Sequence, residues 1–92
     1  MTKIELNDKL AELYGLYEAE MYEDNLVHLI DDWNMLMPLA LQNKIGFFAM
    51  NKIVLAGRDD IGSIARYSEH ETIEAAAQYA IAMALIKLAE SK

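Results

Sequence analysis

Hydrophobic residues recur at helical spacing at both ends of the chain and at strand-like spacing between them. Near the start, apolar residues follow a helical stripe from Leu6 to Tyr14, after a Thr2 and Glu5 pair with capping-box spacing. This pattern predicts a first helix over about residues 3–14.

A period of two follows from Leu16, where apolar residues alternate with acidic ones. Turn-forming residues and a β-prone run complete the pattern of a hairpin over residues 16–30. A competing interpretation continues the first helix through Gly15 at a cost of about 1 kcal/mol, because the helical stripe also extends to Met21. That alternative leads to an all-α helical bundle, and we favour the hairpin.

The apolar stretch at residues 33–41 predicts a second helix. With Asn34 as the N-cap, Pro38 falls in the first turn, where its missing N–H has no partner to lose; with Asp32 as the N-cap, the helix must kink. Asn43 is suited to end this helix because asparagine tolerates the left-handed conformation.

Three β-prone runs come next, at residues 45–50, 53–56 and 63–67. The first two are separated by two residues, which is the length of a hairpin turn, and a loop rich in glycine and aspartate at 57–62 precedes the third. These runs predict further antiparallel strands.

The longest helix is predicted over about residues 69–90, with Ser68 and Glu71 as a capping box. Its apolar arc is wider than one sheet face requires. We therefore expect either a second layer of the fold or a partner to cover the flank formed by Tyr79, Met83 and Ile86.

Together these elements predict a single domain, residues 1–92, of the α+β class. The expected fold is a small sandwich in which helices, including a long C-terminal one, pack on a short antiparallel sheet of about four to five strands. The apolar content of 54% with 25% charged residues excludes a disordered chain.

The composition also narrows the cellular setting and the chemistry. No cysteine is present, which favours a cytoplasmic protein, and charged residues within the first twelve positions break any signal-peptide core. No apolar run reaches the roughly 20 residues of a membrane span. No metal-binding, nucleophile or phosphate-binding motif occurs, so we expect no enzyme activity, no metal and no cofactor.

The charge suggests a type of partner. Eight basic residues against fifteen acidic ones give a net charge of −7, which disfavours direct nucleic-acid binding and favours a basic protein surface, including a groove that normally holds nucleic acid. The candidate contact residues are acidic in one group and apolar in the other: Glu18, Glu20, Glu23 and Asp24, and then Tyr79, Met83 and Ile86.

One segment resembles a known family. The stretch Asp31-Asp32-Trp33-Asn34-Met35-Leu36-Met37-Pro38-Leu39 lies between an N-terminal Leu-Ala-Glu-Leu-Tyr-Gly segment and an apolar helix that starts near Glu71. This order resembles small phage and prophage proteins of the family named for a phage α-β-α sandwich domain. The resemblance implies an α+β sandwich, a phage origin and no enzymatic activity.

The leading hypothesis is therefore a phage accessory protein in the host cytoplasm that binds a host protein, such as an anti-CRISPR inhibitor of a defence complex. One alternative is a module that binds or sequesters a nucleotide through Arg58 and Arg66. Another is a structural homo-oligomer, for instance a homodimer formed through the C-terminal helix.

Overall fold

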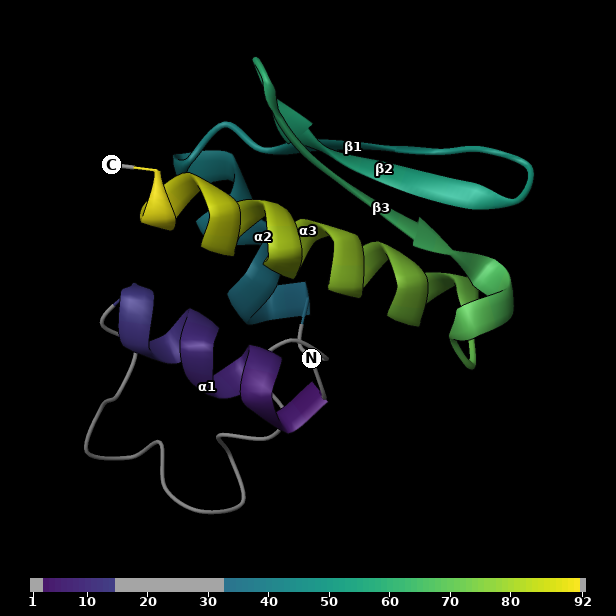
Figure 1. Cartoon of the computed structure of the whole chain (residues 1–92), viewed down its shortest axis with the longest axis horizontal. Helices are drawn as coiled ribbons and strands as arrows, with labels where there is room; N and C mark the ends of the chain where they lie inside the picture. Colours follow the sequence, from purple (N-terminus) through teal and green to yellow (C-terminus); the bar gives the residue numbers. More distant parts are fainter. Residues whose placement is uncertain (1–2, 15–32, 92) are drawn as a thin grey trace.

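The computed structural model describes residues 3–14 and 33–91, which form a small α+β domain (Figure 1). In chain order the elements are α1 (Lys3–Leu13), α2 (Trp33–Gln42), β1 (Gly46–Ala49), β2 (Ile53–Arg58), β3 (Ile61–Arg66), a short 3-10 helix η2 (Tyr67–Glu69) and α3 (Ile73–Glu90). The α+β class is thus confirmed, and the all-helical alternative is wrong.

The strands form one antiparallel sheet in the order β1-β2-β3, joined by two tight turns. Phe48 pairs with Leu55, and Leu55 pairs with Ile64 on the next strand. The described residues contain three strands, so the expected count of four to five is not confirmed. The predicted hairpin at residues 16–30 lies outside the described residues.

The described elements form layers, with the sheet on one side, α3 across its inner face and α1 on the far side of α3 (Figure 1). Helix α2 also packs against α3. All three helices therefore lie on the same side of the sheet. The other side of the sheet, which we call the open face, has no described helix over it.

Helix α3 is buried along most of its length because two layers cover it. Its buried residues face both the sheet and the other helices: Ala76, Ala77, Gln78, Ala80, Ile81, Ala82, Ala84, Leu85, Ile86 and Leu88. Small alanine side chains let the helix lie close to its neighbours, and Ile81 and Leu85 fill the centre of the core. This second layer is what the wide apolar arc required.

The start of α3 differs from the prediction. Thr72 is the N-cap, and its side-chain oxygen accepts a hydrogen bond from the backbone N–H of Ala75 at 2.9 Å. The predicted capping residue Ser68 lies in η2 instead. The helix starts later because the chain must first turn from the end of β3 toward the inner face of the sheet.

Both ends of α2 bear on the prediction, which had Asn34 as one of two possible N-caps and Asn43 as the residue that ends the helix. Asn34 lies inside the helix rather than at its cap, so Pro38 is beyond the first turn and cannot donate to the carbonyl oxygen of Asn34. At the other end, Lys44 rather than Asn43 takes the left-handed conformation, with φ of 59°. Ile45 N–H then donates to Ala40 at 2.8 Å, which is the Schellman arrangement that ends many helices.

Helix α1 is fixed to α3 by apolar and polar contacts. Its residues Leu6 and Leu10 are fully buried. The Tyr14 hydroxyl donates to the carbonyl oxygen of Leu85 at 2.6 Å, and Lys9 pairs with Glu90 at 2.9 Å. The hydrogen bond with Glu90 raises the pKa of Lys9, and burial raises the pKa of Tyr14.

Candidate functional site

The open face of the sheet is the part of the described structure that most resembles a binding surface. Side chains alternate between the two faces of a strand, and the inner positions Val54, Ala56, Ser63 and Ala65 are buried beneath α3. The open face therefore carries the remaining positions, in three rows across the strands: Gly46, Gly57 and Gly62; Phe48, Leu55 and Ile64; Met50, Ile53 and Arg66.

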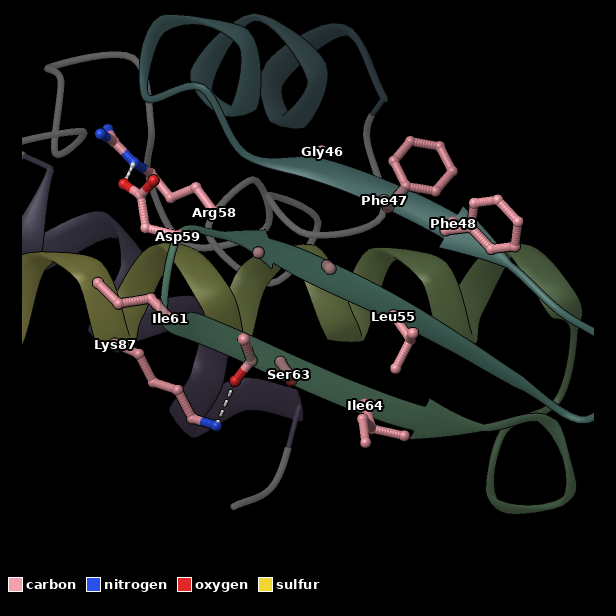
Figure 2. A pocket seen from close by; sticks show the side chains of 13 residues that line it. Gly46, Phe47, Phe48, Leu55, Arg58, Asp59, Ile61, Ser63, Ile64 and Lys87 are labelled. Carbon is pink, nitrogen blue, oxygen red and sulfur yellow. Dashed lines mark hydrogen bonds and ion pairs between the residues drawn. The ribbon is translucent and has the colours of Figure 1, made fainter.

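The middle row is a continuous line of large apolar side chains, which we call the apolar row. Phe48, Leu55 and Ile64 lie side by side on three neighbouring strands (Figure 2). Phe48 is 66% exposed and Ile64 is 60% exposed. The solvent face of an antiparallel sheet is normally polar, so an exposed line of this kind makes the open face a candidate contact surface.

Beside it runs the glycine row, formed by Gly46, Gly57 and Gly62. A Cβ atom on Gly57 would overlap the carbonyl oxygen of Ile61 and lie 2.8 Å from the Cα atom of Gly62, so the sheet itself requires glycine there. A Cβ atom on Gly46 would meet nothing within 4 Å. The row leaves a strip of bare backbone next to the apolar row.

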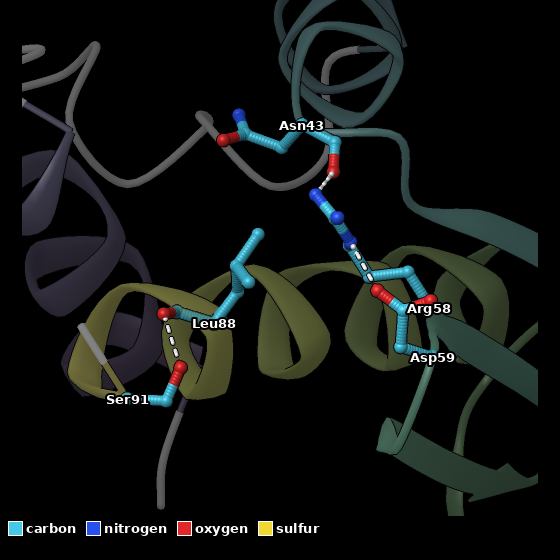
Figure 3. Close-up of polar contacts among 5 residues, drawn as sticks. All are labelled: Asn43, Arg58, Asp59, Leu88 and Ser91. Carbon is cyan, nitrogen blue, oxygen red and sulfur yellow. Dashed lines mark hydrogen bonds and ion pairs between the residues drawn. The ribbon is translucent and has the colours of Figure 1, made fainter.

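The two rows line a shallow hollow of about 890 Å³. At its end, Arg58 reaches the turn between β2 and β3, donating to the carboxylate of Asp59 at 3.2 Å and to the carbonyl oxygen of Asn43 at 3.2 Å (Figure 3). These contacts use two of the five N–H donors of the Arg58 guanidinium. The second predicted nucleotide contact, Arg66, lies at the opposite end of β3, so the structure does not bring the two arginines together.

The free edge of β3 is partly closed by a lysine. Lys87 extends from α3 and donates to the carbonyl oxygen of Gly62 at 2.8 Å (Figure 2). Lysine side chains at sheet edges hinder the addition of a further strand. The face of the sheet is therefore a better contact surface than this edge.

Charge is scarce on the open face although the chain is strongly acidic. Of the nine residues in the three rows, only Arg66 is charged, and no ion pair joins it to another described residue. Among the described residues, the exposed carboxylates Asp59 and Asp60 lie in the turn beyond the glycine row. One end of the face is thus basic and the other acidic.

The structure describes only some of the contact residues predicted from the sequence. Glu18, Glu20, Glu23 and Asp24 lie outside the described residues. On α3, Ile86 is only 2% exposed, Met83 is half-buried, and the ring of Tyr79 lies 4.9 Å from that of His70. Much of this apolar flank is therefore covered by the fold itself.

Trp33 packs at the edge of the core. Its ring is half-buried against the core and stacks on Phe47, with ring centroids 6.1 Å apart. The apolar row was missed because Phe48, Leu55 and Ile64 come from three separate runs, and only the strand register aligns them. The sequence of β3 gives no signal of this row, because Ser63 and Ala65 are buried there while the larger Ile64 is exposed.

The described residues were also searched for metal-binding groups and for membrane-spanning helices. Within residues 3–14 and 33–91, histidine and acidic side chains form no group of three that could hold a metal ion. Among the helices described, none is long and apolar enough to cross a membrane. Comparison with known proteins finds no matching family model, no matching curated protein and no matching solved structure.

Proposed function

We propose that this chain is a protein-binding domain whose contact surface is the open face of its sheet. The observation that carries the proposal is the apolar row, in which Phe48 and Ile64 are each more than half exposed beside a half-buried Leu55. Burying such side chains removes roughly 25 cal/mol of unfavourable hydration per Å². Their exposure is therefore costly in an isolated domain and useful in a complex.

Other ligands fit this face less well. Nucleic acid binding needs several basic groups on the phosphates, whereas the three rows hold only Arg66 and the whole chain carries −7. A nucleotide would need a guanidinium free to hold its phosphates, and Arg58 is engaged by Asp59 and Asn43. An apolar protein surface matches the face best.

The role of a phage accessory protein that acts on a host defence complex remains part of this proposal. Its support is the resemblance around Trp33 and the acidic charge, which favours encounter with a basic host protein. In this scheme the acidic charge of the chain provides the long-range attraction to the host protein.

A pair of matched positions tests the proposal. A photo-crosslinking amino acid is placed at Ile64, on the open face, or at Ile73, in the first turn of α3; these isoleucines are 60% and 59% exposed. In cells that express the full chain, we expect protein crosslinks from position 64 and few from position 73. Equal or absent crosslinking at the two positions would contradict the proposal.

A further inference from the structure

We infer that the occupant of the open face is a second copy of this chain, which packs sheet against sheet with its apolar row over the glycine row of the first. This inference rests on the proposed function of that face and names its partner. It differs from the dimer through α3 that the sequence analysis offers as one alternative, because most of that helix is buried within the fold.

The first argument is the fit between the two rows. They run parallel across the same three strands and are two residues apart along each strand, or about 7 Å. A two-fold axis that lies between the rows, parallel to them, places the apolar row of each copy on the glycine row of the other. Phe48 then faces Gly46 of the second copy, Leu55 faces its Gly57, and Ile64 faces its Gly62.

Gly46 supports this arrangement because nothing within the described chain requires a glycine there. A Cβ atom would have open space, and Gly46 is not among the residues with positive φ. Glycine weakens a strand, and within a sheet it often marks a place where another backbone or ligand approaches closely. The side chain of Phe48 from a second copy would fill that space.

The second argument is charge complementarity along β3. On β3 the open-face residues are Gly62, Ile64 and Arg66, and Asp60 lies in the turn just before the strand, so that Ser63 is midway between Asp60 and Arg66 in sequence. The same two-fold axis reverses this order, so Arg66 of each copy comes next to the turn that carries Asp60 of the other. Two copies of an acidic chain thus meet through a face with few charges and gain two ion pairs at its rim.

The third argument is the type of packing. Two antiparallel sheets commonly pack face to face, about 10 Å apart and with strand directions within about 30°. All three described helices lie on the inner side of this sheet, and Lys87 hinders growth at the β3 edge. Face-to-face packing of two copies covers the open face and requires no rearrangement of the described elements.

The first test reverses the charges of Asp60 and Arg66. Sedimentation of the purified full chain, from low to high micromolar concentration, measures whether it is a monomer or a dimer. The wild type is expected to form a dimer of two 10.4 kDa chains. Asp60→Arg and Arg66→Asp should each weaken it at least about tenfold by placing like charges opposite each other. A mixture of the two variants should form a heterodimer, because both basic positions of one chain then face both acidic positions of the other.

Gly46→Val tests whether the apolar row of one copy packs on the glycine row of the other. Valine should leave the monomer fold intact, because the added atoms at Gly46 meet open space, and yet weaken the dimer at least about tenfold by filling the glycine row. The matched control is Ala49→Val on the same strand, at a position of the opposite face, which should leave the dimer unchanged.

The outcomes separate this inference from the proposed function. A wild-type monomer at high micromolar concentration, or a mixture of the charge variants that fails to pair, overturns the inference. If position 64 then crosslinks to a different protein, the proposed function stands without it. If position 64 crosslinks to a second copy and the charge variants pair, both are supported; if it crosslinks to no protein, both fail.

Discussion

At the scale of single residues, the three glycines of the open face differ in how much space each has for a side chain. Gly57 is required by the sheet, because a side chain there would overlap the backbone of the neighbouring strand at Ile61. Gly62 has ordinary space, with the nearest atom 3.7 Å from a Cβ position, and Gly46 has open space. Only the first of them is explained by the fold of one chain.

This difference leads to a prediction. Gly57→Ala should lower the free energy of unfolding by about 1–3 kcal/mol, because the strands must move apart to admit the methyl group. Gly62→Ala is the control and should change it by less than about 0.5 kcal/mol. Urea unfolding of dilute protein measures both, and equal effects of the two substitutions would contradict this account.

At the scale of elements, the sequence predicts most of the helices and strands but not the apolar row on the open face. The runs at 45–50, 53–56 and 63–67 are each found as strands with shifted ends, because short β-prone runs carry a clear local pattern. The start of α3 was misplaced because capping-box spacing at Ser68 is a local signal, whereas Thr72 caps the helix where the chain meets the core.

The surface itself depends on long-range information. Phe48, Leu55 and Ile64 form one row only because β1, β2 and β3 pair in one particular register. A shift of one residue would move each side chain to the other face. Composition and motifs drew attention to carboxylates and to the flank of α3, and neither kind of signal reports on strand register.

The contact between α1 and α3 gives a prediction about alkaline pH. Burial raises the pKa of Tyr14 above its ordinary 10.0 in the folded protein, so the fold favours the protonated hydroxyl that donates to Leu85. This contribution is complete below about pH 10 and is lost as the pH rises through the raised pKa.

Tyr14→Phe should therefore destabilise the protein by about 0.5–1.5 kcal/mol at neutral pH. The difference in unfolding free energy between wild type and variant should shrink as the pH rises above about 10. Urea unfolding of both proteins at a series of pH values measures this difference. A difference that stays constant up to strongly alkaline pH would show that the hydroxyl does not contribute in this way.

At the scale of the whole molecule, the two faces of the sheet differ in what covers them. The inner face of the sheet holds the core, built on Val54, Ile81 and Leu85. The open face holds apolar side chains that the fold leaves exposed. A sheet covered by described helices on one side only leaves its second side for contact with another molecule, and for that reason we place the interface there.

The contact of α1 with α3 has a consequence for the order in which the structure forms. The hairpins and α3 are close in sequence, whereas Tyr14 and Leu85 are 71 residues apart, and closing so long a loop costs more entropy. We expect α1 to dock last and to detach first in brief openings of the native state. Amide hydrogen exchange should then be faster in α1 than in α3, and equal protection of both helices would indicate one indivisible folding unit.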